Sequence, residues 1–133
     1  MNVQQAMTRA VVAVTPQQSA AIAVQRLCAW DISGLPVVDC DRHLLGVLTE
    51  LDLIRALRAG ANLQEVTVGE VMSERALFVE PETSLQAAAD LIDERQVRRL
   101  PVCEYGHLVG VISRGDVLRA MAAATPVPAT LAR

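Results

Sequence analysis

Aromatic residues are scarce in this chain of 133 residues, which contains one Trp, one Tyr and one Phe. So few aromatic side chains cannot form the platform on which successive bases of a single-stranded nucleic acid stack. The net charge of −3 also argues against a basic surface that neutralises many phosphates. Nucleic acid is therefore not an expected partner, although a local basic cluster could still hold one phosphorylated ligand.

Long hydrophobic runs and cysteine pairs are also missing. The longest apolar runs, such as residues 10–14, are far shorter than the roughly 20 residues of a membrane-spanning helix. The first residues show neither the charged leader nor the apolar core of a signal peptide. Cys28, Cys40 and Cys103 have no Cys-x-x-Cys spacing, which predicts reduced thiols rather than disulfides or a zinc site. We expect a cytoplasmic protein without a membrane partner.

No combination of residues in the sequence indicates catalysis or metal binding. A Ser-His-Asp set, a carboxylate pair and a phosphate-binding glycine loop are all absent. His43 and His107 have no carboxylate or thiol at metal-ligand spacing, so we predict exposed turn residues. Cys28 and Cys103 are predicted to be small core residues. Trp30 is assigned a packing role, with a position at a cleft or an interface as the alternative. The sequence therefore predicts no enzyme, no cofactor and no metal.

What the sequence does contain is an internal duplication. A shift of 65 residues superimposes identical residues: Val3, Met7, Val14, Pro16, Ser19, Ala23, Leu35, Pro36 and Val37 fall on Val68, Met72, Val79, Pro81, Ser84, Ala88, Leu100, Pro101 and Val102. Past residue 42 the shift becomes 64, and identities continue from His43 with His107 to Ala56 with Ala120. We expect a first repeat over residues 1–58, a linker over 59–67, a second repeat over 68–122 and a flexible tail over 123–133.

Both copies show the same order of predicted elements. Short apolar runs at 11–14 and 77–79 fit buried strands, and apolar residues at helical spacing follow them at 20–28 and 85–92. Two further strands come next, at 35–38 and 44–48 or at 100–103 and 108–112, with short polar links as in hairpins. A second helix begins at Thr49 or Ser113. The prediction is an α+β fold of two β-α-β-β-α repeats, packed with approximate twofold symmetry because neither buries its sheet alone.

The most informative motif lies where the third predicted strand meets the second helix. Gly46-Val-Leu-Thr49-Glu-Leu-Asp52 recurs as Gly110-Val-Ile-Ser113-Arg-Gly-Asp116. One interpretation is a helix cap, in which the hydroxyl and the carboxylate accept from free backbone N–H groups. The other is a ligand site, because a helix N-terminus suits a phosphate, an ionised Asp suits a ribose diol, and glycine permits close approach. The two roles are compatible.

Together these features resemble the CBS domain, named after cystathionine β-synthase. They are the duplicated unit, Met-[Thr/Ser] before the first strand, Leu-Pro-Val in the second, and Gly-h-h-[Thr/Ser]-x-x-Asp at the end of the third. The resemblance covers residues 3–121, and a tandem pair is the family's Bateman module. It implies regulatory binding of AMP, ADP, ATP or S-adenosylmethionine in two clefts between the copies. It also implies a homodimer.

The resemblance assigns residues to each cleft by position. Asp would hold the ribose, Thr or Ser the phosphate, and apolar residues of the opposite copy the base. One cleft would use Ser113 and Asp116 with Ile32 and the segment from Thr8 to Val12, which includes Ala10. The other would use Thr49 and Asp52 with Val97 and the segment from Ser73 to Leu77.

The two clefts are not expected to be equal. Before Leu-Pro-Val the first copy has Ile32-Ser33-Gly34, whereas the second has Val97-Arg98-Arg99. Guanidinium groups form charge-assisted hydrogen bonds with phosphate. We therefore expect the Asp116 cleft, with Arg99, Arg98 and Arg114, to bind a phosphorylated ligand better than the Asp52 cleft. The alternative is that these arginines only solvate a charged helix end.

Two classes of function remain open at this point. The first is a stand-alone regulatory module that senses adenine nucleotides and acts in trans on an effector protein. The second is a structural dimerisation or interaction module whose clefts are empty or hold a ligand without an adenosyl group. Binding of adenosyl compounds distinguishes the two.

Overall fold

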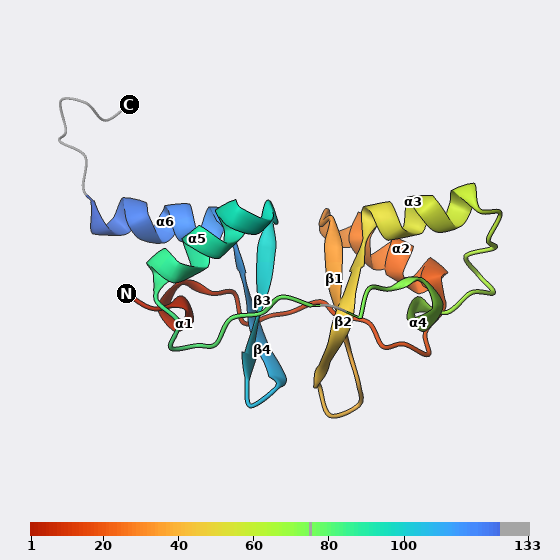
Figure 1. Cartoon of the computed structure of the whole chain (residues 1–133), viewed down its shortest axis with the longest axis horizontal. Helices are drawn as coiled ribbons and strands as arrows, with labels where there is room; N and C mark the ends of the chain where they lie inside the picture. Colours follow the sequence, from red (N-terminus) through yellow and green to blue (C-terminus); the bar gives the residue numbers. More distant parts are fainter. Residues whose placement is uncertain (75, 126–133) are drawn as a thin grey trace.

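The computed structural model describes residues 1–74 and 76–125, which form two halves lying side by side (Figure 1). The first half contains α2 (Ala20–Trp30), β1 (Gly34–Val38), β2 (Leu44–Thr49) and α3 (Glu50–Arg58). The second contains α5 (Leu85–Arg95), β3 (Arg99–Glu104), β4 (His107–Ser113) and α6 (Arg114–Ala124). Two short helices, α1 (Val3–Ala6) and α4 (Val68–Val71), complete the chain. Most of the tail predicted over 123–133 lies outside the described residues.

Each half carries one antiparallel hairpin, and the two hairpins face each other at the centre of the molecule (Figure 1). In the first hairpin Gly34 is paired with Thr49, and in the second Arg99 is paired with Ser113. Thr49 and Ser113 are thus the last residues of β2 and β4, and the helix that follows each strand begins at the next residue. Each motif therefore spans the junction between a strand and a helix. The mixture of helices and small antiparallel sheets confirms the predicted α+β fold.

The first strand predicted in each copy is reduced to a single residue of parallel pairing. Val14 is bridged to Val37, and Val79 is bridged to Val102. The Val14 N–H donates to the Pro36 carbonyl, and the Val38 N–H donates to the Val14 carbonyl. A longer ladder would next need an N–H from Pro36, which proline lacks. Pro101 stops the second ladder in the same way, since Val79 donates to its carbonyl.

The two short helices are exchanged between the halves. Val3 of α1 is fully buried among residues of the second half, including Leu85, Leu100 and Ile112. Val68 of α4 is fully buried among residues of the first half. In Figure 1, α1 lies beside α5 and α6, and α4 lies beside α2 and α3. Each hydrophobic core thus contains a piece of the other repeat, so neither repeat has a complete core of its own.

Glycines allow the exchanged segments to cross the central sheets. A Cβ atom on Gly46 would lie 2.2 Å from the Ser73 carbonyl oxygen, and one on Gly110 would lie 2.6 Å from the Met7 sulfur. Thr8 exchanges two backbone hydrogen bonds with Val111, each 2.9 Å long. We expected another group to approach these glycines closely, and in the structure that group is a segment of the other repeat.

Two of the packing predictions for single residues need correction. Cys103 is buried between the halves with Val38 and Leu108, but Cys28 is exposed and does not belong to the core. Trp30 is 64% exposed and has no packing role in the core. It ends α2, where the following residue adopts a left-handed conformation and turns the chain away. No helix in the described part of the chain is long and apolar enough to cross a membrane.

Candidate functional site

Each of the two motifs forms a helix cap. The Thr49 hydroxyl accepts from the Asp52 N–H at 3.2 Å, and the Asp52 carboxylate accepts from the Thr49 N–H at 2.9 Å. Ser113 and Asp116 repeat this reciprocal pair at 3.1 and 2.9 Å. Each cap satisfies backbone groups that would otherwise lack partners at a helix start. The capping interpretation therefore describes the local geometry, and it leaves one carboxylate oxygen of each Asp available for another partner.

The second carboxylate oxygen distinguishes the two aspartates. Asp116 is only 7% exposed, and its Oδ1 accepts a 2.7 Å bond from Arg119 Nη2. The Thr8 hydroxyl lies 3.4 Å from both of its carboxylate oxygens. Asp52 is half-buried, and among the described residues it forms no ion pair with Arg55, the counterpart of Arg119. Among the described residues, therefore, only the aspartate of the second motif forms an ion pair with an arginine of its own helix.

A cleft with a volume of about 210 Å³ opens beside Asp116. We call it the Asp116 cleft. Its walls come from both repeats: Thr8, Ala10, Val11, Val12, Trp30, Ile32, Gly34 and Pro36 from the first, and Arg99, Val111, Ser113, Asp116 and Arg119 from the second. The residues assigned to this cleft from the sequence line it, except Arg9, Arg98 and Arg114. An apolar wall thus faces a carboxylate, a hydroxyl and two guanidinium groups.

A larger cleft of about 510 Å³ lies beside Thr49, and we call it the Thr49 cleft. It is lined by Ser33, Gly34, Leu35, Pro36, Val47, Thr49, Glu50 and Leu51 from the first repeat, and by Gln96, Val97, Arg98, Arg99, Pro101 and Val111 from the second. Thr49 and Val97 meet here as predicted by position. Asp52 and Ser73 are not among its lining residues, so this cleft is less complete than its counterpart.

The three arginines predicted to serve one cleft are separated in the structure. Arg99 lines both clefts, whereas the exposed Arg98 lines only the Thr49 cleft. The Arg114 Nε donates to the Val97 carbonyl at 2.9 Å, and Arg114 lines neither cleft. The expected group of three around Asp116 is therefore reduced to Arg99. Arg119 takes a place beside it that the sequence analysis did not assign.

The environment of Arg99 is unusual for an arginine. Its Nε is buried and, within the described part of the chain, has no hydrogen-bond partner. Burial lowers the pKa of its guanidinium, the neighbouring Arg98 charge lowers it further, and Asp116 opposes both effects. An arginine nonetheless stays protonated near neutral pH. A positive charge with an unused donor therefore lies on the wall of both clefts, where an anion would stabilise it.

Four residues that line the Asp116 cleft, Gly34, Pro36, Val111 and Arg119, were not assigned to it from the sequence, although Arg119 had a signal. Arg119 follows Asp116 by three positions on α6, and residues at this spacing are neighbours on a helix surface. Trp30 was assigned to packing, with a position at a cleft as the alternative, and it is the alternative that the structure shows. Its position at the cleft depends on the left-handed Asp31 that ends α2, which the sequence pattern does not reveal.

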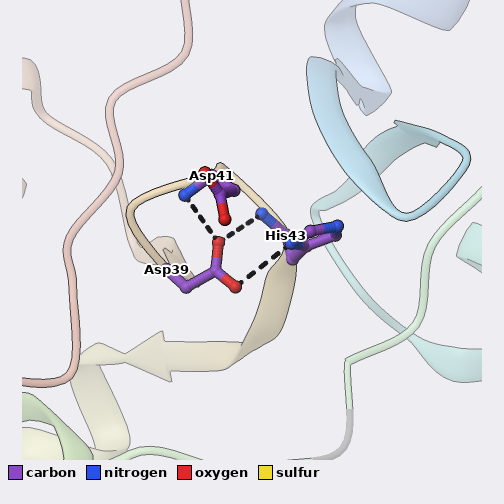
Figure 2. A group of neighbouring side chains, drawn as sticks. All are labelled: Asp39, Asp41 and His43. Carbon is purple, nitrogen blue, oxygen red and sulfur yellow. Dashed lines mark hydrogen bonds and ion pairs between the residues drawn. The ribbon is translucent and has the colours of Figure 1, made fainter.

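His107 is exposed at a hairpin turn, as predicted, but the prediction that no carboxylate accompanies the turn histidines is wrong for His43. Asp39, Asp41 and His43 each place one possible metal-ligand atom within 4.8 Å of the others (Figure 2). The Asp39 carboxylate accepts from the Asp41 and His43 N–H groups, and its Oδ2 lies 3.1 Å from His43 Nδ1. The His43 N–H is the first cause of the lowered Asp39 pKa. These oxygens already stabilise the turn, so the cluster has a structural role without an ion.

His43 also connects the two repeats. Its ring centroid lies 4.2 Å from that of His107, and the two residues are bridged through their backbones. The Leu44 N–H donates to the Gly106 carbonyl, and the Leu108 N–H donates to the Arg42 carbonyl. The hairpin turns are thus joined opposite the edge at which the clefts open. This junction fixes the distance between the two sheets that form the cleft walls.

Comparisons with known proteins agree with the duplication and with the fold. The family model described as the CBS domain matches twice, at residues 3–59 and 68–123. Hypoxic response protein 1 of Mycobacterium tuberculosis is 32% identical over 114 residues, covering 85% of this chain and 80% of that protein. The CBS domain-containing protein YhcV of Bacillus subtilis is 32% identical over 116 residues, covering 87% and 82%.

Solved structures are similar over nearly the whole chain. A crystal structure of CBSX2 in complex with AMP has a TM-score of 0.81 and 32% identity, covering 92% of this chain and 97% of that one. CBSX2 is a protein of Arabidopsis thaliana. A crystal structure of Hypoxic Response Protein I with two coordinated zinc ions also has a TM-score of 0.81, with 31% identity and coverage of 90% and 98%.

Proposed function

This chain belongs to the CBS domain family, as a pair of CBS domains, and we propose that it is a regulatory module that binds adenine nucleotides between its repeats. The observation that carries the proposal is the Asp116 cleft. It combines an acidic side chain, a hydroxyl at a helix start and a guanidinium with an apolar wall from the opposite repeat. The similarity to CBSX2, whose structure was solved with AMP, supports the same ligand class.

Each part of an adenosyl ligand has a suitable partner in this cleft. The base would lie against Ala10, Val12 and Ile32, which offer apolar surface without competing polar groups. The ribose diol would donate to Asp116, an acceptor-only group when ionised. Phosphate would accept from the Ser113 end of α6 and from Arg99.

Binding would require the Asp116 cleft to open. Its volume of about 210 Å³ is below the roughly 300 Å³ of a typical small-molecule pocket. The Arg119 guanidinium also occupies the Asp116 oxygen that a ribose would use. Release of Arg119 would free this oxygen and enlarge the cleft. The ligand would thereby stabilise an open form and shift the population of conformers.

We further propose that the regulatory output passes through other chains. Apolar side chains stand exposed on equivalent faces of α3 and α6, among them Ile54 and Leu57 on α3 and Leu118 and Met121 on α6. A second copy of the chain would bury these faces in a homodimer, and an effector protein would respond in trans to the ligand-dependent form. No enzymatic step belongs to this proposal.

A thermal-shift series with AMP, ADP, ATP and S-adenosylmethionine tests the proposal. A ligand at one hundred times its Kd stabilises the folded state by about 2.7 kcal/mol. We expect a rise in the unfolding temperature with at least one compound, lost in Asp116→Ala. Because Arg119 already satisfies Asp116, a structural module with empty clefts is the competing interpretation. The absence of a shift with all four compounds would support it.

A further inference from the structure

The Asp116 cleft and the Thr49 cleft share part of one wall. Of the described residues, Gly34, Pro36, Arg99 and Val111 line both. Arg99 alone among these four carries a charge. The two clefts are therefore adjacent compartments, and a guanidinium group stands at the boundary between them.

The duplication supplies only one such arginine for two clefts. The position equivalent to Arg99 in the first repeat is Gly34, which has no side chain. The sheet registers confirm the equivalence, because Arg99 is paired with Ser113 and Gly34 with Thr49. A phosphate at the Thr49 helix start therefore has no arginine of its own at this strand position. The arginines that line the Thr49 cleft, Arg98 and Arg99, both come from the opposite repeat, and of these two only Arg99 also lines the Asp116 cleft.

The unsatisfied state of Arg99 makes it sensitive to whichever cleft is filled. Its buried Nε has no hydrogen-bond partner among residues 1–74 and 76–125, and its charge is disfavoured by burial and by Arg98. A phosphate in either cleft would supply the missing acceptor and the opposite charge. Two phosphates drawn to one guanidinium would also repel each other across a short distance.

We propose that Arg99 couples the two clefts, so that a phosphorylated nucleoside in one weakens the binding of a phosphorylated nucleoside in the other. This inference rests on the proposed function and adds how the filling of one cleft affects ligand binding in the other. The coupling depends on the phosphate, so an unphosphorylated nucleoside shows none. The module then responds over a wider range of nucleotide concentration than two independent sites would.

The test is a titration of the full chain with AMP and, in parallel, with adenosine. Backbone amide NMR signals of Thr49 and Ser113 report the filling of each cleft separately, and calorimetry gives the stepwise affinities. The affinity of the Thr49 cleft alone comes from Asp116→Asn, which keeps the shape of the cap and removes the carboxylate charge from the Asp116 cleft. We expect the second AMP to bind about 5- to 150-fold more weakly than the same cleft binds AMP alone. Adenosine should show no such difference.

Arg99→Met keeps the apolar stem of the side chain and removes the guanidinium. It should weaken AMP in both clefts and abolish the coupling. Arg98→Met is the matched control, because Arg98 lines only the Thr49 cleft. It should weaken AMP there alone and leave the coupling intact. Arg99→Met and Arg98→Met both keep Asp52 and Asp116, so their results do not depend on the folding of Asp116→Asn.

The outcomes separate this inference from the proposed function. AMP filling one cleft while adenosine fills two is the extreme form of the expected result. Independent filling of both clefts by AMP, or an effect of Arg99→Met on one cleft only, would overturn the coupling and leave nucleotide binding in place. Equal coupling with adenosine would also overturn it. Failure of every adenosyl compound to bind would overturn both proposals.

Discussion

Arg119 Nη2 donates a 2.7 Å hydrogen bond to Asp116 Oδ1 from one turn further along α6. The first repeat has the same two residue types at the same spacing, Asp52 and Arg55, and no ion pair joins them within the described residues. The same pair of residue types at the same spacing therefore makes different side-chain contacts in the two repeats. The difference matters because Asp116 is the acceptor that we assign to a ribose, and an arginine already occupies it.

Removal of Arg119 should strengthen the binding of adenosine. In Arg119→Met the Asp116 oxygen becomes available without the breaking of an ion pair. That ion pair is worth roughly 1 kcal/mol, since Arg119 is largely exposed, which corresponds to about a fivefold gain in affinity. Calorimetry measures this gain in affinity with adenosine rather than AMP, because the phosphate of AMP could itself contact Arg119. Arg55→Met is the control and should change nothing; weaker binding in Arg119→Met would show that Arg119 holds the ligand.

The two aspartates should differ in their effect on AMP. Asp116→Ala or Arg99→Ala should weaken AMP binding about 10- to 100-fold, the equivalent of one charge-assisted hydrogen bond. Asp52→Ala should have a smaller effect, because Asp52 does not line the Thr49 cleft. Both aspartates cap a helix, so unfolding measurements on the two Ala variants control for lost stability. Equal losses of affinity would contradict the predicted inequality of the clefts.

Much of the fold could be predicted from the sequence because the same pattern of strands and helices occurs in both repeats. The hairpin strands predicted at 35–38 and 44–48 occur as Gly34–Val38 and Leu44–Thr49. Apolar periodicity could not place Val3 and Val68, since it shows that a residue is buried but not in which core. Their exchange between the halves is determined by tertiary contacts, including backbone hydrogen bonds such as the one that the Val3 N–H donates to the Thr83 carbonyl.

The composition of the clefts was predictable in part. Position in the repeat brings Thr8, Ile32 and Ser113 to the Asp116 cleft. It does not separate Arg98 from Arg99, although successive residues at a strand start point in different directions. The sequence also shows Arg119 and Arg55 as equivalents. Their different contacts accompany a difference in burial, since Asp116 is buried and Asp52 is half-buried, and the sequence does not reveal this difference.

The three cysteines should react with thiol reagents at two different rates. Cys28 and Cys40 are exposed, whereas Cys103 is buried. Burial raises the pKa of the Cys103 thiol to about 11. At pH 8 about one in a thousand Cys103 side chains would then be the reactive thiolate. We expect two thiols per native chain to be labelled quickly and the third only after unfolding in denaturant. Rapid labelling of all three thiols in the wild-type chain, or of both remaining thiols in Cys28→Ser, would contradict the burial of Cys103.

Alanine at the central glycines should destabilise the protein in a defined order. A Cβ on Gly46 would overlap the Ser73 carbonyl oxygen at 2.2 Å, and the backbone there cannot yield without parting the repeats. On Gly110 the closest atom, at 2.6 Å, belongs to the flexible Met7 side chain. Gly46→Ala should therefore lower the free energy of unfolding by more than about 2 kcal/mol, as overpacking does, and Gly110→Ala by less.

Gly34→Ala provides the matched control for this series. Its added Cβ would lie 3.5 Å from the nearest atom, an ordinary van der Waals distance. Urea unfolding of the three variants should rank them Gly46, Gly110 and Gly34 in decreasing loss of stability. Because the Gly46 overlap is with the exchanged segment of the other repeat, its variant should also expose Cys103 to thiol reagents. A stable Gly46→Ala chain with a protected Cys103 would contradict the close crossing at the centre of the molecule.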